Sequence, residues 1–140
     1  MPVDNVQERA GAVLFKQNPM TLLGPELRAG DPAPQFNLSA ADLSTVNLDI
    51  LVDECKRAAM LIVVPSLDTS VCSLESQKFN ARLGELPAGV AVGVVSMDLP
   101  FAQARWCGAQ NGEIKLQMLS DYRDHSFGLN YGLIIKELGF

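Results

Sequence analysis

The sequence has few of the residues on which small metal-bound or disulfide-rich domains depend. Its 140 residues include three cysteines and one histidine, His125. Three cysteines do not make a structural disulfide framework. A tetrahedral zinc site would need all three cysteines together with His125, and the paired spacing of such ligands is missing. We therefore expect no metal and no cofactor.

The sequence also lacks an excess of positive charge and any long apolar run. Its formal net charge is −5, which leaves no electrostatic footprint for nucleic acid or an anionic membrane. No apolar run reaches the length of a membrane span, and residues 1–9 lack the features of a signal peptide. We expect a cytoplasmic protein that binds neither nucleic acid nor membrane. Because 48% of its residues are hydrophobic, residues 1–140 can bury the core of a single domain.

Residues 61–72 combine the end of a strand with the start of a helix. Leu61–Val64 is a short run rich in β-branched residues, which is typical of a buried strand. Pro65 ends the strand because it has no N–H to donate. Residues 66–70 are mostly helix-capping types, and Cys72 falls at or near the first helical turn. The free N–H groups and the dipole of a helix start favour a thiolate, so this pattern predicts a reactive cysteine.

The rest of the chain alternates short strands and helices. Residues 11–24 are typical of a hairpin whose turn lies at residues 17–19. The spacing of Cys72, Phe79, Leu83 and Leu86 places them on one face of the helix that begins near Cys72. Further strands are expected at 36–38, 59–64, 90–97 and 116–119, and further helices at 98–108 and 124–130. This order predicts an α/β domain with a partly parallel sheet and Cys72 at its carboxyl edge.

Six segments carry a resemblance to a known family. The central one is Pro65-x-x-x-Thr69-x-x-Cys72. The others are NPMTLLG at 18–24, GDPAPQF at 30–36, DLPFAQARWC at 98–107, LSD at 119–121 and YGLIIKE at 131–137. The first is the peroxiredoxin active-site pattern, and together the segments resemble the bacterial thiol peroxidases, which are atypical two-cysteine peroxiredoxins.

The resemblance implies a thioredoxin-like fold with an added N-terminal β-hairpin, and a homodimer. It implies that Cys72 is the peroxidatic cysteine and Cys107 the resolving cysteine, with Thr69 and Pro65 forming the peroxide pocket. Hydrogen peroxide and alkyl hydroperoxides would be the substrates, and thioredoxin the reductant. Cys55 matches no catalytic position, and its charged neighbours suggest an exposed bystander. His125 also matches no role and is interpreted as a polar helix residue.

Two cysteines on different helices cannot form a disulfide unless their Cα atoms come within about 7 Å. We therefore expect local unwinding around Cys72 and around Cys107 when the sulfenic acid of Cys72 is converted to a disulfide. Finding two free thiols after peroxide treatment would contradict this hypothesis.

The sequence departs from the family near its end. Family members continue past the position of Phe140 through a strand with an active-site arginine, a second strand and a closing helix. Arg57, Arg82, Arg105 and Arg123 do not align with that arginine. We therefore expect either a fragment of a longer protein or a variant that is shortened relative to the family, with exposed strand edges. The alternative is a catalytically impaired, thioredoxin-like fragment or module that acts in redox-responsive interactions. A thiol–disulfide oxidoreductase is a weaker alternative, because Cys-x-x-Cys is missing. Smaller departures are Glu75-Ser76 in place of Gln-Thr, and Trp106 in place of Phe.

Overall fold

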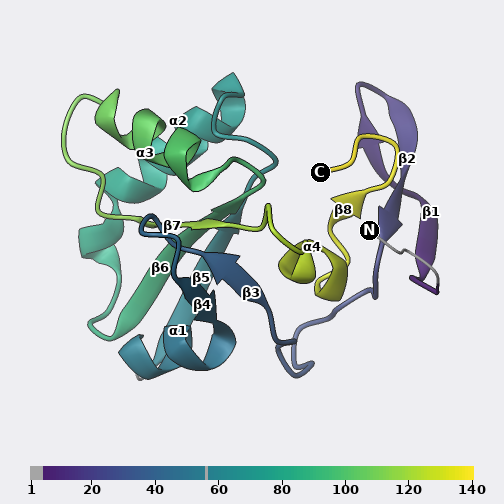
Figure 1. Ribbon diagram of the computed structural model, residues 1–140, viewed down its shortest axis with the longest axis horizontal. Coiled ribbons are helices and arrows are strands. Elements are labelled where there is room, and N and C mark those ends of the chain that lie inside the picture. The colour runs from purple at the N-terminus through teal and green to yellow at the C-terminus, as the bar shows by residue number, and fades with distance from the viewer. Residues whose placement is uncertain (1–4, 56) are drawn as a thin grey trace.

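Two sheets of unequal size organise the structure, a computed structural model that describes residues 5–55 and 57–140 (Figure 1). The larger sheet has five strands in the order β4-β3-β7-β6-β5, and the smaller has three in the order β1-β2-β8. The strands are β1 (Glu8–Phe15), β2 (Asn18–Leu23), β3 (Asn37–Ser39), β4 (Thr45–Asn47), β5 (Ala58–Val63), β6 (Val90–Ser96), β7 (Gln117–Ser120) and β8 (Ile134–Ile135). The helices are α1 (Leu48–Cys55), α2 (Ser70–Ala81), α3 (Pro100–Gly108) and α4 (Ser126–Asn130), with a 3-10 turn at Leu83–Glu85.

The centre of the larger sheet is parallel, as predicted from its three apolar runs. Ile62 of β5 pairs with Val94 of β6, which in turn pairs with Met118 of β7. β3 runs antiparallel to both β4 and β7. Because β5 and β6 are parallel neighbours, the loops that follow them leave the same edge of the sheet. Those two loops lead into α2 and α3, the helices that carry Cys72 and Cys107.

Alternate residues of the parallel strands build a hydrophobic core on each face of the sheet. One core joins Val95 and Leu119 to Leu51 of α1 and Phe127 of α4. The other joins Val94 and Met118 to Trp106 of α3, with both Cys72 and Cys107 packed against it. Successive side chains of a strand point to opposite faces of the sheet, so neighbouring residues of one strand pack into different cores. Helices therefore cover both faces, which confirms the predicted mixed α/β architecture.

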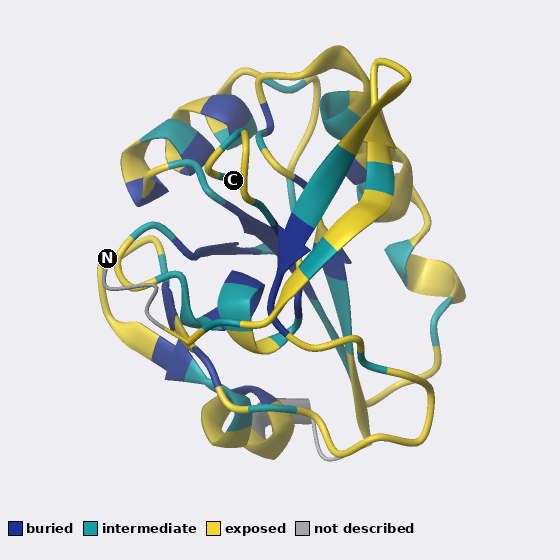
Figure 2. Ribbon diagram, turned by 90° about the vertical axis from the view of Figure 1, so that its right-hand side faces the viewer, coloured by how far each residue is buried: buried dark blue, intermediate teal, exposed yellow. Residues whose placement is uncertain are grey.

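The predicted N-terminal hairpin is present, with its turn one residue earlier than expected. Lys16 and Gln17 occupy the turn with φ of 47° and 66°, and Asn18 and Pro19 belong to β2. Positive φ at both central residues is the geometry whose twist suits a two-residue hairpin. β8, which was not among the predicted strands, joins this hairpin and not the larger sheet. Figure 2 shows that β1 is largely exposed along its length, whereas β2 becomes buried toward its end at Leu22 and Leu23.

The helix after Cys72 does not present the single apolar face that was predicted. α2 ends at Ala81, so Leu83 and Leu86 follow the different geometry of a 3-10 turn and its exit. Cys72 and Leu83 pack against the core, whereas Phe79 is 37% exposed and faces a groove. The residue of α2 that is fully buried is Ser76.

The strand β5 forms one edge of the larger sheet. Within residues 5–55 and 57–140 no strand pairs with its outer side, and Val63 at its end is 44% exposed. Across the same residues, no helix combines the length and the apolar character needed to cross a membrane.

Candidate functional site

Cys72 lies in the first turn of α2, as predicted, and is a half-buried free cysteine. Thr69 is the N-cap residue, with an extended backbone at φ −83° and ψ 140°, but its side chain makes no capping hydrogen bond. Its hydroxyl instead donates to the Ser66 carbonyl at 3.1 Å. The Thr69 side chain therefore does not occupy the N–H groups of the first turn of α2. These groups can stabilise negative charge near the Cys72 sulfur.

Asp98 holds the loop between β5 and α2 in place. Its Oδ1 accepts a hydrogen bond from the Ser66 hydroxyl at 2.7 Å, and its Oδ2 accepts one from the backbone N–H of Leu67 at 2.8 Å. The Ser66 hydroxyl oxygen in turn accepts a bond from the N–H of Asp68 at 3.1 Å. These bonds fix the backbone between Pro65 and Thr69. The sequence suggested only that Asp98 opens α3, and this anchoring role was missed.

The hydrogen bonds of Asp98 continue to buried polar residues at the carboxyl edge of the larger sheet. Ser96, which is 2% exposed, donates from its hydroxyl to Asp98 Oδ2 at 2.9 Å. Gln103 of α3 is 1% exposed, and its amide donates to the Ser96 hydroxyl at 3.0 Å and to the Leu119 carbonyl at 2.9 Å. Ser120 donates to the backbone carbonyl of Asp98. One connected polar network therefore joins the Cys72 loop to the helix that carries Cys107.

Cys107 lies in the last turn of α3 and is also a free cysteine. It packs against the same core as Cys72, and burial raises the pKa of its thiol above the ordinary value. α2 and α3 contact each other directly here, because the Trp106 indole N–H donates to the Ser73 hydroxyl at 2.9 Å. The structure therefore places the two predicted redox cysteines in terminal turns of adjacent helices.

Pro65 lines a cavity to which neither Thr69 nor Cys72 contributes. The cavity has a volume of about 230 Å³ and is also lined by Asp121, Ile134 and Phe140. The structure therefore places the three residues of the predicted peroxide pocket on the loop after β5 and in the first turn of α2, and of the three only Pro65 lines this cavity.

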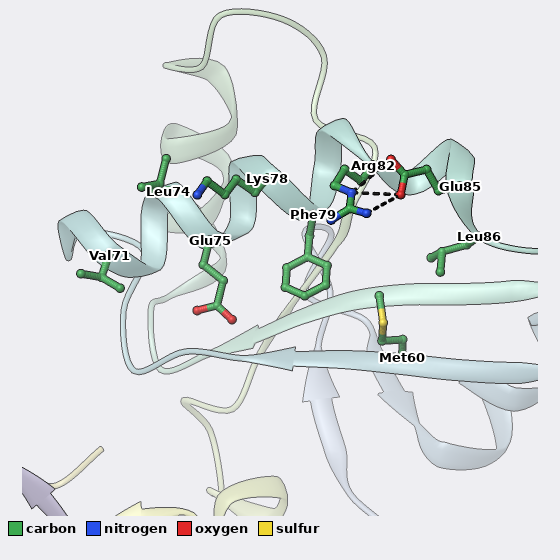
Figure 3. Close-up of a pocket in the computed structure, with 9 residues that line it drawn as sticks. All are labelled: Met60, Val71, Leu74, Glu75, Lys78, Phe79, Arg82, Glu85 and Leu86. Atoms are coloured by element: carbon green, nitrogen blue, oxygen red, sulfur yellow. Dashed lines mark hydrogen bonds and ion pairs between the residues drawn. The ribbon is translucent and has the colours of Figure 1, made fainter.

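A larger groove of about 640 Å³ lies between α2 and β5 (Figure 3). Val71, the neighbour of Cys72, forms one end, and Arg82 pairs with Glu85 at 2.7 Å at the other. Phe79 points from α2 toward Met60 of β5 (Figure 3). The groove runs away from the cysteine, and nothing in its lining links it to peroxide chemistry.

Other candidate residues take no part in this site. His125 precedes α4 with φ 56° and lines a separate cavity near the hairpin, so it does not lie within a helix as expected. The Arg105 guanidinium lies 3.5 Å from Asp68 in the Cys72 loop, although both side chains are largely exposed. The side chain of Cys55 is outside the described part of the structure. Among the residues that the structure describes, no cluster of three His, Cys, Asp or Glu side chains is arranged for a metal ion.

Comparison with known proteins gives consistent matches. Residues 28–139 match the family model described as Redoxin. A thiol peroxidase of Halalkalibacterium halodurans is 50% identical over 91% of this chain and 74% of its own length. A thiol peroxidase of Oceanobacillus iheyensis is 47% identical over 90% of this chain and 74% of its own. The crystal structure of a peroxiredoxin-like protein from Aquifex aeolicus superposes with a TM-score of 0.75 at 39% identity, covering 94% of this chain and 72% of that one.

Proposed function

The chain belongs to the Redoxin family as a thiol peroxidase, and from this premise we propose that Cys72 is its peroxidatic cysteine and Cys107 its resolving cysteine. The fold is accordingly the thioredoxin-like fold of peroxiredoxins, with the N-terminal hairpin. The observation that carries the assignment is the position of Cys72 in the first turn of α2. The N-cap residue of this helix is Thr69, whose side chain makes no capping hydrogen bond.

In the first step, the Cys72 thiolate attacks one oxygen of the peroxide ROOH. The O–O bond breaks, the sulfur becomes a sulfenic acid, and RO⁻ leaves and takes up a proton as ROH. The N–H groups at the start of α2 stabilise negative charge on the sulfur and on the reacting oxygens. Because the Thr69 hydroxyl donates its hydrogen to Ser66, its oxygen lone pairs are available to accept a hydrogen bond from the peroxide.

In the second step, the Cys107 thiolate attacks the Cys72 sulfur. The S–O bond breaks, the S–S bond forms, and the oxygen leaves as hydroxide, which a proton converts to water. Burial raises the pKa of Cys107, so its thiolate is disfavoured while α3 is intact. Unwinding of the last turn of α3 would expose Cys107 to water and remove that penalty. The local unwinding expected from the sequence would therefore favour the Cys107 thiolate and also allow the two sulfur atoms to approach each other.

The proposal extends to the partners implied by the resemblance. Thioredoxin would reduce the Cys72–Cys107 disulfide by thiol–disulfide exchange, and hydrogen peroxide and alkyl hydroperoxides would be the substrates. A homodimer and a cytoplasmic location are further parts of the proposal. Analytical ultracentrifugation of the reduced chain tests the first of these.

The test is peroxide consumption by the purified chain with thioredoxin, thioredoxin reductase and NADPH. We expect turnover that is lost in Cys72→Ser. Cys107→Ser should still consume about one equivalent of peroxide, because the first step does not need Cys107. A folded chain without turnover would contradict the proposal and favour the redox-responsive interaction module. Circular dichroism of each variant controls for folding.

A further inference from the structure

Four residues near the two cysteine-bearing turns form a closed ring of hydrogen bonds, which passes through three side chains and both the indole and the backbone carbonyl of Trp106. We call this ring the clasp (Ser73, Gln77, Trp106 and Gln110). The Trp106 indole N–H donates to the Ser73 hydroxyl at 2.9 Å, and the Gln77 amide donates to the same oxygen at 3.2 Å. Gln77 also donates to Gln110 Oε1 at 2.8 Å, and the Gln110 amide donates to the Trp106 carbonyl at 2.8 Å. The clasp therefore ties the first half of α2 to the end of α3.

Each cysteine is next to a member of the clasp. Ser73 follows Cys72 in the first turn of α2, and Trp106 precedes Cys107 in the last turn of α3. Terminal turns open at lower free energy than helix centres, since fewer backbone hydrogen bonds must break. Trp106 is only 7% exposed, so its indole N–H is withdrawn from water and depends on Ser73 for a partner. Unwinding either turn separates Ser73 from Trp106 and breaks this bond.

We propose that the clasp controls the conversion of the Cys72 sulfenic acid to the Cys72–Cys107 disulfide, with Trp106 and Ser73 as positioning residues. The inference rests on the proposed function of the two cysteines. A closed clasp keeps both turns wound for the peroxide step and opposes the opening that the disulfide requires. A neutral hydrogen bond contributes about 0.5–1.5 kcal/mol, which corresponds to a factor of about 2 to 10 in the population of the open form.

The experiment is a single turnover of the reduced chain with one equivalent of hydrogen peroxide. Samples are quenched at intervals, the sulfenic acid is trapped with dimedone, and mass spectrometry measures the sulfenic acid and the disulfide. Trp106→Phe removes the bond between Trp106 and Ser73, and Ser73→Ala removes that bond together with the one from Gln77. We expect each to raise the rate of disulfide formation about 2- to 10-fold without changing the rate of sulfenic acid formation. Because Ser73→Ala already removes the bond that Trp106→Phe removes, the double variant should be no faster than Ser73→Ala alone.

Asn80→Ala is the matched control. The Asn80 amide donates to the Glu113 carbonyl at 2.9 Å and its oxygen accepts from the Lys115 N–H at 2.7 Å, so it also ties α2 to the segment after α3. Its loss should lower stability and leave the rate of disulfide formation unchanged. Acceleration of the same size in Asn80→Ala, or no acceleration in both clasp variants, would overturn the inference. A wild-type chain that forms no Cys72–Cys107 disulfide would overturn the proposed function and the clasp together.

A second measurement does not depend on peroxide. In the reduced chain, opening of the α3 terminus can be followed by alkylation of Cys107 in a Cys72→Ser background. Trp106→Phe and Ser73→Ala should raise the alkylation rate by the same factor as they raise disulfide formation. In Ser73→Ala the chain keeps its single tryptophan, so a change in Trp106 fluorescence reports the loss of the bond directly. Unchanged alkylation in both variants would refute a closed clasp.

Discussion

Replacing Asp98 by alanine should loosen the loop that carries Pro65 and Thr69 and destabilise the whole chain. Asp98 accepts bonds from the Ser66 hydroxyl, the Leu67 N–H and the Ser96 hydroxyl at 2.7, 2.8 and 2.9 Å. Leu67 is 2% exposed, so its N–H would be left buried without a partner, at a cost of about 1–3 kcal/mol.

The magnitude follows from the number of bonds and from what can replace them. A hydrogen bond to a charged group contributes about 1.5–3 kcal/mol, but Ser66 is half-buried and can bond to water instead. Removing the carboxylate also relieves its own desolvation, which offsets part of the loss. We therefore expect Asp98→Ala to lower the free energy of unfolding by about 3 kcal/mol, and Asp98→Asn, which keeps one acceptor oxygen, by about half as much.

Urea unfolding followed by the fluorescence of the single tryptophan measures this change. Asp42→Ala is the control, because Asp42 also accepts from a serine hydroxyl and a backbone N–H, both of Ser44, but in an exposed turn. Its urea midpoint should stay close to that of the wild type. Asp98→Ala should also slow sulfenic acid formation at Cys72. A shift for Asp98→Ala as small as that for Asp42→Ala would refute the anchoring role.

Three further predictions concern other sites. Ser76→Ala should raise the free energy of unfolding by about 1 kcal/mol, because the fully buried Ser76 hydroxyl has no hydrogen-bond partner among the described residues. Urea unfolding measures this change, and a lower midpoint would contradict it. In Cys72→Ser, alkylation of Cys107 should reach its half-maximal rate at a pH above that of an ordinary thiol, because burial raises the pKa of Cys107; a lower pH would contradict the burial. Gly132→Ala should destabilise the chain by more than about 1 kcal/mol, because Gly132 has φ +67° and a Cβ there would lie 2.0 Å from the Pro25 carbonyl oxygen; a thermal melt equal to that of the wild type would contradict this.

Much of the fold was predictable from local patterns. The runs that became β5, β6 and β7 are short and largely apolar, and those of β5 and β6 contain β-branched residues. The helix predicted over 98–108 is α3, which begins at Pro100. The position of Cys72 at a strand-to-helix junction also followed from residue types alone. These features depend on residues that are close together in the sequence, so local sequence patterns can predict them.

The features that were missed depend on contacts between distant segments. Asp98 was interpreted through the helix that follows it, but its side chain crosses to the loop after β5, because β5 and β6 end side by side. The predicted apolar face of α2 assumed one continuous helix through Leu86, whereas the helix ends at Ala81. The pairing of β8 with β2 required knowledge of where the hairpin lies.

The clasp was hidden for the same reason. Trp106 and Ser73 are far apart in the sequence, and neither residue type alone predicts a hydrogen bond across two helices. The parallel sheet brings α2 and α3 onto one face, and only then do the turns of Cys72 and Cys107 become neighbours.

The central claim is that Cys72 and Cys107 act together on peroxide. The most direct measurement is thiol counting with mass spectrometry after one equivalent of hydrogen peroxide, without oxygen or reductant. The account predicts the loss of two hydrogen atoms, a Cys72–Cys107 disulfide and one remaining free thiol, that of Cys55. Free thiols at both Cys72 and Cys107 after the peroxide is consumed would contradict it.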